Sequence, residues 1–229
     1  TTYTGEYSRG EFSLGIPNGK GTITYANGSV YTGEIRDGEL SGQGTNTLAL
    51  GDVYVGEFRR NQRYGPGTLT YVNGDVFTGL FTLDIPRKGR LAYANGDLYT
   101  GEVTGELLVN NWINRLQSSQ RGVRTILTIP DGNGTFTFAN GDVFTGVFDS
   151  GETKQGRFAY ANGAVYIGKV VGRLRSGQGV LTQSNGEILD GNWENDEFII
   201  PESSIATTPV ESVTSEVPDS SIATTPAEP

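Results

Sequence analysis

The sequence predicts an all-β protein, an elongated single-layer antiparallel sheet of repeated β-hairpins followed by a disordered C-terminal tail. Glycine is abundant, 34 of 229 residues, without a Gly-X-Y period, which excludes collagen and favours frequent turns. A short phrase, Asn-Gly-Asp-Val-Phe-Thr-Gly, occurs at 73–79 and again at 140–146. After Phe198 the composition changes abruptly, because residues 199–229 contain no glycine, aromatic residue, lysine or arginine.

The repeat has a period of 22 or 23 residues. Variants of the phrase place turn glycines at Gly28, Gly51, Gly74, Gly96, Gly141, Gly163 and Gly186. The one interval of 45, from 96 to 141, equals 22 plus 23 and therefore predicts a degenerate unit within 104–130, at about 118–122. We expect about eight units and a terminal half unit over residues 1–198, with 199–229 as a separate tail.

Each unit is typical of a β-hairpin, since Asn-Gly between alternating runs favours a type I′ turn with positive φ at both central residues. With a two- or four-residue loop, Phe77 and Phe81 would share a face with Thr68 and Thr70. A three-residue loop would invert that parity. Units that cannot bury a core alone would stack into one ribbon or trough.

Stacking would align aromatic residues into a ladder. Two readings stay open: the rings form the core, or they line a groove that binds a partner. The ladder comprises Tyr3, Tyr7, Tyr31, Tyr54, Phe58, Phe77, Phe81, Tyr99, Phe144, Phe148 and Tyr166.

The pattern Tyr-x-Gly-Glu-aromatic, then Gly-x-Gly, then Asn-Gly, resembles the MORN repeat over residues 3 to about 194. The usual tryptophan of that family is kept only at Trp193, and residues 104–130 depart most from the pattern. The resemblance implies an elongated antiparallel ribbon that works in scaffolding, protein binding or dimerisation, with lipid binding also proposed for the family.

Charge is uneven along a chain whose net charge is −9. Only the segment 59–124 has a net positive charge, because it contains nine lysine and arginine residues and five aspartate and glutamate residues. This basic patch would meet lipid phosphates, meet the acidic tail, or be scattered surface charge, and the last reading is preferred. The patch comprises Arg59, Arg60, Arg63, Arg87, Lys88, Arg90, Arg115, Arg121 and Arg124.

Two acidic rows follow the repeat. Glu6, Glu34, Glu57 and Glu102 are interpreted as a solvated β face, because general acid-base catalysis needs carboxylates in a pocket that separates their pKa values. Asp52, Asp75, Asp97 and Asp142 are interpreted as turn residues. A calcium row is the disfavoured alternative, since one carboxylate per turn falls short of six to eight oxygens.

The tail carries one segment twice, Ser-Ser-Ile-Ala-Thr-Thr-Pro at 203–209 and 220–226. Its composition predicts a solvated linker. The sharper hypothesis is a pair of motifs, centred on Ile205 and Ile222, that enter a partner groove or join a sheet edge.

Cysteine, histidine and methionine are absent, which removes thiolate and imidazole chemistry and the common metal sites. We therefore expect no catalytic residues, no metal and no cofactor. The sequence predicts a non-enzymatic scaffold that contacts a protein partner or itself, with head-to-tail filaments as one form and a lipid-binding module as the alternative. The acidic charge disfavours nucleic acid and membrane. The missing cysteine, the Thr at position 1 and the Ser/Thr/Pro tail slightly favour an extracellular or cell-surface location over the cytoplasm.

Overall fold

The computed structural model describes residues 1–7, 15–107 and 126–200. The chain divides into two compact units, Thr1–Ile199 and Ile200–Pro229. The described residues belong almost wholly to the first unit. The tail motifs with Ile205 and Ile222 lie outside the described residues. Residues 118–122, where the degenerate unit was predicted, also lie outside them. Among the described residues, no helix is long and apolar enough to cross a membrane.

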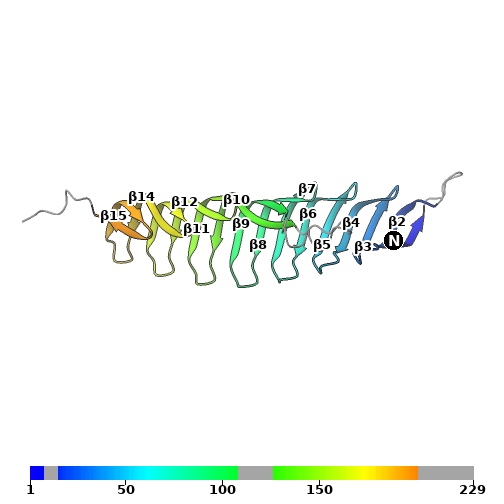
Figure 1. Cartoon of the computed structure of the whole chain (residues 1–229), viewed down its shortest axis with the longest axis horizontal. Coiled ribbons are helices and arrows are strands. Elements are labelled where there is room, and N and C mark those ends of the chain that lie inside the picture. Colours follow the sequence, from blue (N-terminus) through cyan, green and yellow to red (C-terminus); the bar gives the residue numbers. More distant parts are fainter. Residues whose placement is uncertain (8–14, 108–125, 201–229) are drawn as a thin grey trace, which may run out of the picture. The chain divides into compact units, whose positions relative to one another are not determined.

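The first unit is one 16-stranded sheet in which each strand pairs antiparallel with its sequence neighbours, from β1 to β16 in order (Figure 1). The predicted fold class is therefore confirmed. The strands are β1 (Thr2–Tyr7), β2 (Pro17–Thr24), β3 (Val30–Arg36), β4 (Glu39–Thr47), β5 (Val53–Arg59), β6 (Gln62–Thr70), β7 (Val76–Thr82), β8 (Ile85–Ala92), β9 (Leu98–Leu107), β10 (Ile126–Thr137), β11 (Val143–Asp149), β12 (Glu152–Ala159), β13 (Val165–Val171), β14 (Leu174–Thr182), β15 (Ile188–Glu194) and β16 (Glu197–Ile199).

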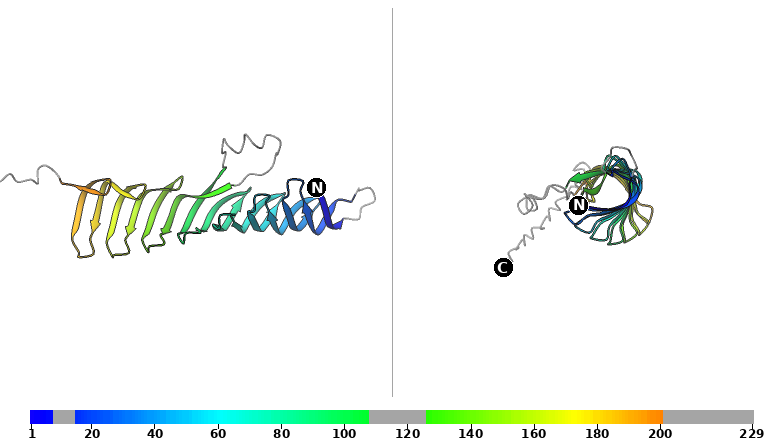
Figure 2. Two further views of the ribbon diagram at one scale, coloured as in Figure 1. Left: turned by 60° about the horizontal axis from the view of Figure 1, so that its bottom comes forward. Right: turned by 90° about the vertical axis from the view of Figure 1, so that its right-hand side faces the viewer.

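The strands of this unit are arranged around an arc, so that the sheet has an inner and an outer face (Figure 2). Burial alternates along each strand: in β5, Tyr54 and Phe58 are buried whereas Val55 is exposed. Since successive side chains point to opposite faces, the inner face holds the core and the outer face meets solvent. Two rims bound the trough, an Asn-Gly rim formed by the turns after the even-numbered strands and a return rim formed by the turns after the odd-numbered strands.

The Asn-Gly turns are three-residue loops. At the turn between β6 and β7, the Tyr71 amide donates to the Asp75 carbonyl and the Gly74 amide donates to the Tyr71 carbonyl, both at 2.9 Å. Only the glycine has positive φ, 92° at Gly74. The predicted type I′ turn is therefore wrong here, because a type I turn followed by a left-handed glycine closes the hairpin instead.

Type I′ geometry occurs on the return rim, where no Asn-Gly is present. Arg60 and Asn61 have φ values of 52° and 69°, and Leu83 and Asp84 have values of 51° and 71°. Positive φ at both central residues matches the twist of the flanking strands. Leu83 adopts a backbone conformation that is unusual for its residue type.

The three-residue loop also inverts the predicted parity. Leu69 faces Phe77, and Thr68 faces Thr78. The aromatic residues therefore share the inner face with Leu69, not with Thr68 and Thr70. The two threonines join the outer face, where the Thr68 and Thr78 hydroxyls lie 3.2 Å apart.

The segment predicted to hold a degenerate unit is an insertion between paired strands. β9 pairs directly with β10, and Gly101 faces Gly134, as Gly56 faces Gly67 two units earlier. The two strands continue past the usual turn position to the pair formed by Leu107 and Ile126. Residues 108–125 lie outside the described part of the chain. The described sheet thus passes through this region without an added hairpin, and the 45-residue interval reflects an insertion of about one repeat length.

Candidate functional site

The aromatic ladder is the core of the array. Its members from Tyr31 to Tyr166 are at most 3% exposed. Rings pack edge to face within a unit and between units: the centroids of Tyr54 and Phe58 are 5.1 Å apart, and those of Tyr54 and Phe81 are 5.0 Å apart. Tyr3 is half-buried, and the side chain of Tyr7 lies outside the description. Of the two readings, the structure places the rings from Tyr31 to Tyr166 in the core.

Paired glycines make room for each ring. A Cβ on Gly67 would lie 2.4 Å from the Tyr54 hydroxyl oxygen, and one on Gly56 would lie 2.6 Å from the Gly67 Cα. The ring therefore lies directly on the backbone of two strands. Its hydroxyl donates to the Glu57 carbonyl at 3.1 Å, which satisfies the polar end of a buried side chain.

Burial sets the ionisation of these phenols. Desolvation and, to a lesser extent, the nearby Glu34 carboxylate together raise the pKa of Tyr31 to about 12. Desolvation also raises the pKa of Tyr54 to about 12, against an opposing effect of Arg63. Neutral phenols are therefore part of the folded state at all physiological pH values.

The described members of the basic patch are distributed over several strands. Arg59 and Arg60 are exposed near the return rim after β5, while Arg87, Lys88 and Arg90 are exposed on β8; Arg115, Arg121 and Arg124 lie outside the described residues. Arg63 is buried, and its Nε lies 3.3 Å from the Asp84 carboxylate. It also lies over the rings of Tyr54 and Phe81.

The carboxylates of the glutamate row contact the backbone of the neighbouring strand. The Glu34 carboxylate accepts from the Gln43 amide at 3.4 Å, and the Glu102 carboxylate accepts from the Asn133 amide at 3.1 Å. The side chain of Glu57 lies against Gly65, which has a φ of 63°. The side chain of Glu6 lies outside the description. Among the described residues, no group of three acidic side chains is placed to hold a metal ion.

The aspartate row links successive turns. The Asp75 Oδ1 atom accepts from the Ala94 amide of the next turn at 2.8 Å. Its Oδ2 atom accepts from the Asn73 Nδ2 atom at 2.9 Å. Asp97 and Asp142 repeat both contacts. The Asp52 Oδ1 atom likewise accepts from the Val72 amide at 2.9 Å. Sequence reasoning assigned these residues to turns but missed their contacts with the following turn.

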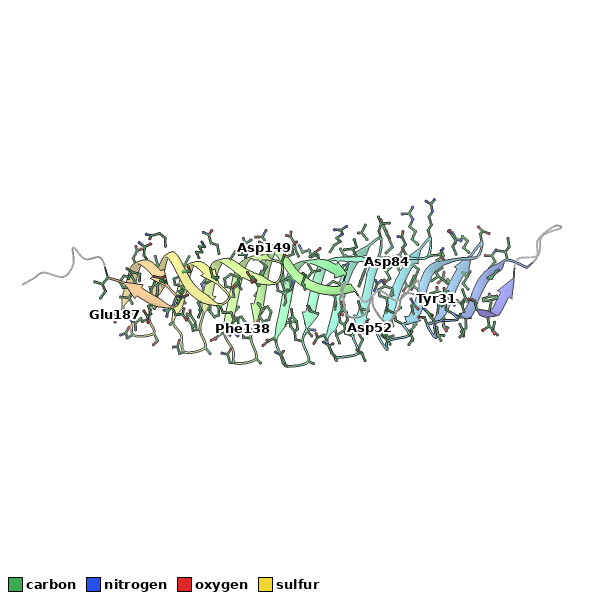
Figure 3. All side chains as sticks on the ribbon, in the orientation of Figure 1. Tyr31, Asp52, Asp84, Phe138, Asp149 and Glu187 are labelled. Carbon is green, nitrogen blue, oxygen red and sulfur yellow. The ribbon has the colours of Figure 1, made fainter. Side chains whose placement is uncertain are left out.

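The two rims approach each other across the trough. In Figure 3, Asp52, Phe138 and Glu187 mark the Asn-Gly rim, and Asp84 and Asp149 mark the opposite rim. The Tyr71 hydroxyl lies 2.7 Å from the Thr128 hydroxyl and accepts from the Thr128 amide at 3.0 Å.

A second contact of this kind joins Arg173 to Phe138, with the guanidinium carbon 3.9 Å from the ring centroid. In both contacts a residue at the return-rim position meets the first residue of an Asn-Gly turn two units earlier. Sequence reasoning missed these bridges, because their partners are 57 and 35 residues apart and no local pattern joins them.

A pocket of about 240 Å³ opens between the rims near the C-terminal end of the sheet. Tyr160, Asn162, Ala164 and Ser184 line it on the Asn-Gly rim, together with Arg175 and Asp196 from the opposite side. The Arg175 Nε atom lies 2.9 Å from the Asp196 carboxylate, and its guanidinium lies 4.3 Å from the Trp193 ring centroid. This pocket is a candidate site, because polar groups converge on a concave surface there. A second pocket, of about 340 Å³, lies beside Lys20, Glu34 and Arg36.

Comparisons with known proteins bear on the repeat. The MORN repeat model matches residues 9–30, 31–47, 54–76, 129–143 and 166–188. No curated protein matches the sequence. Among solved structures, the TCP domain of SAS-4 (dCPAP) from Drosophila melanogaster, in complex with a proline-rich motif of Ana2 (dSTIL), is 15% identical. That match covers 76% of this chain and 85% of the other, with a TM-score of 0.42.

The TCP10 domain of Danio rerio CPAP is also 15% identical, with coverage of 77% and 90% and a TM-score of 0.27. The family assignment does not depend on these structures. The five matched segments follow one another along a single continuous sheet of hairpins. The chain therefore belongs to the MORN-repeat family.

Proposed function

We propose that this protein is a non-enzymatic scaffold that acts through protein–protein contacts. The observation that carries the proposal is the continuous hairpin sheet, in whose core most of the described aromatic ladder is buried. Apolar side chains remain on the outer face: Val55, Leu80, Val147 and Ile167 are between 43% and 56% exposed. An extended surface that carries such residues on several strands suits contact with another protein.

Self-assembly is the finer form of this proposal. β16 pairs only with residues 192–194 of β15, so the remainder of β15 has no strand outside it among the described residues. Unpaired strand edges favour pairing with another chain, and contacts that do not close generate filaments. In this form the tail segments at Ile205 and Ile222 serve as strands donated to a neighbouring copy.

Sedimentation velocity on residues 1–229 beside residues 1–200, over a range of concentrations, tests self-assembly. Large species from the full chain and monomers from the shorter one would support assembly through the tail. Concentration-independent monomers from both would remove self-assembly, and affinity capture with cross-linking would then identify a foreign partner.

The lipid-binding alternative rests on the exposed cations Arg59, Arg60, Arg87, Lys88 and Arg90. Co-sedimentation with vesicles of anionic lipid at low salt tests it. The absence of binding under these conditions, where electrostatic attraction is strongest, would eliminate this alternative.

A further inference from the structure

Three Asn-Gly turns hold a carboxylate in the same way. In each, the aspartate two residues after the asparagine receives one hydrogen bond from the asparagine Nδ2 atom and one from a backbone amide of the next turn. The distances are 2.8 Å or 2.9 Å in all three turns, which are those of Asp75, Asp97 and Asp142. Both carboxylate oxygens are therefore bound by donors that the repeat supplies.

The next turn has both donors but no carboxylate, because Ala164 stands at the aspartate position. Asn162 has the same orientation as its counterparts: its Oδ1 atom accepts from the Ala164 amide at 3.0 Å, as the Asn73 Oδ1 atom accepts from the Asp75 amide at 3.0 Å. The Asn162 Nδ2 atom and the Ser184 amide, which correspond to the two donors at Asp75, make no hydrogen bond to any described residue.

Space for an external group lies beside these donors. Asn162, Ala164 and Ser184 line the pocket of about 240 Å³ between the rims. The Tyr160 side chain borders the same pocket, and Arg175 lies on its far side, paired with Asp196. Since this ion pair leaves the pocket lining close to neutral, a ligand would be recognised mainly through hydrogen bonds from the two donors.

We propose that this pocket binds a carboxylate of a partner polypeptide, an aspartate or glutamate side chain, in the position that Asp75, Asp97 and Asp142 occupy in their own turns. The proposal rests on the proposed function, because it names a chemical group by which a protein partner is held. It assigns the Asn162 Nδ2 atom and the Ser184 amide as the two donors.

The test is a titration of the full chain, labelled with nitrogen-15, with acetate and then with N-acetyl-aspartate N-methylamide. We expect the Ser184 amide proton and the Asn162 side-chain amide to shift downfield and saturate. The N-acetyl-asparagine N-methylamide should produce a much smaller change. A glycine dipeptide with a free carboxy-terminus probes the other source of a carboxylate. If only this dipeptide bound, the assignment to an acidic side chain would be wrong.

Two variants give opposite controls. Ala164→Asp supplies the carboxylate from within the chain, so the Ser184 amide should already be shifted and the titration should be lost. Ser184→Pro removes the amide donor at the second position of a type I turn, where proline is well tolerated, and should also abolish the titration. The Ala94 amide, already bonded to Asp75, should not respond in any of these proteins.

An unchanged titration in Ala164→Asp would overturn the proposal, as would a wild-type Ser184 amide that fails to respond to acetate. These results would leave the scaffold function untouched, because the probes do not depend on a partner. Conversely, a protein partner whose binding is unaffected by Ala164→Asp would support the scaffold function and exclude this pocket as its contact.

Discussion

Each buried ring in the array depends on the absence of side chains beneath it. Gly67 has ordinary negative φ, so its requirement for glycine comes from space alone. The Tyr54 ring occupies the volume that a methyl group on this residue would need. The second glycine of Gly-x-Gly is thus required for packing, whereas the first, Gly65, has a φ of 63° that favours glycine. The turn to the next strand uses a separate pair of residues, Arg60 and Asn61.

We predict that Gly67→Ala destabilises the array by about 1–3 kcal/mol, the usual cost of overpacking a core. Chemical denaturation followed by circular dichroism measures the change. Pro66→Ala, on the exposed neighbouring residue, serves as the matched control and should have a much smaller effect. Equal stability of the Gly67→Ala and wild-type chains would contradict the packing argument.

The substitution Asp142→Ala removes the carboxylate from its turn and leaves the Asn140 Nδ2 atom and the Ala161 amide without their acceptor, as at Ala164 in the next turn. We expect a loss of about 1–3 kcal/mol in stability, because two charge-assisted hydrogen bonds are removed. The Ala161 amide, which donates to Asp142 at 2.8 Å, should lose its downfield shift and recover it on addition of acetate. An Ala161 amide that is unmoved by the substitution would show that the bond to Asp142 is weak in solution.

At the level of elements, the hairpins tolerate insertion at one rim. The β9–β10 pair keeps the repeat register from the pair of Leu98 with Thr137 to the pair of Val103 with Pro130. Beyond it the strands continue in pairing, and Thr128 bonds to Tyr71. The inserted chain therefore leaves the ladder of glycine pairs undisturbed.

Replacement of residues 107–126 by Asn-Gly should therefore leave the sheet intact, since it joins the paired residues Glu106 and Leu127 through a two-residue type I′ turn. The expected change in melting temperature is small, because the Tyr71–Thr128 contact is retained. The same replacement combined with Thr128→Val should lower stability by about 1–3 kcal/mol through loss of a buried hydrogen bond. A shortened chain that failed to fold would show that the insertion contributes to the core.

The sequence was sufficient for the hairpin repeat and its period, because these follow from alternation and turn chemistry over a few residues. It left open whether the aromatic ladder forms the core or lines a groove. It was insufficient for the turn type, and hence for the face that Thr68 and Thr70 occupy. The number of residues in a loop decides that parity, and Asn-Gly is compatible with more than one loop. The pocket at Ala164 was not predicted, because its two donors belong to consecutive turns. The missing carboxylate at Ala164 is recognisable only by comparison with Asp75, Asp97 and Asp142 at the same position of other units.

On the scale of the whole array, tyrosines buried in many units titrate abnormally. Desolvation raises the pKa of Tyr31, Tyr54 and Tyr93 from 10.0 to about 12, and that of Tyr99 is raised as well. Above pH 10 the unfolded chain loses phenolic protons that the folded chain keeps. The stability that neutral phenols contribute is thus complete below pH 10 and is lost as the pH rises towards 12.

We therefore predict cooperative alkaline unfolding within this window. Ultraviolet absorbance of tyrosinate and far-ultraviolet circular dichroism should change together, because the buried phenols ionise only when the sheet opens. Complete ionisation of tyrosine near pH 10 without loss of the sheet signal would contradict the predicted burial.

The bridges between the rims have a mechanical consequence. A long channel with an open slot twists easily, because its two lips can slide past each other, whereas a channel closed along its length resists torsion. The Tyr71–Thr128 and Phe138–Arg173 contacts join the lips at two points, each spanning two units of the array. Along the described part of the sheet, these two points are where sliding of one lip past the other meets the most resistance. Torque applied to this protein would therefore twist the stretches away from the bridges most. The part of the sheet that carries the Ala164 pocket would twist at lower torque than the part joined by the Tyr71–Thr128 and Phe138–Arg173 contacts.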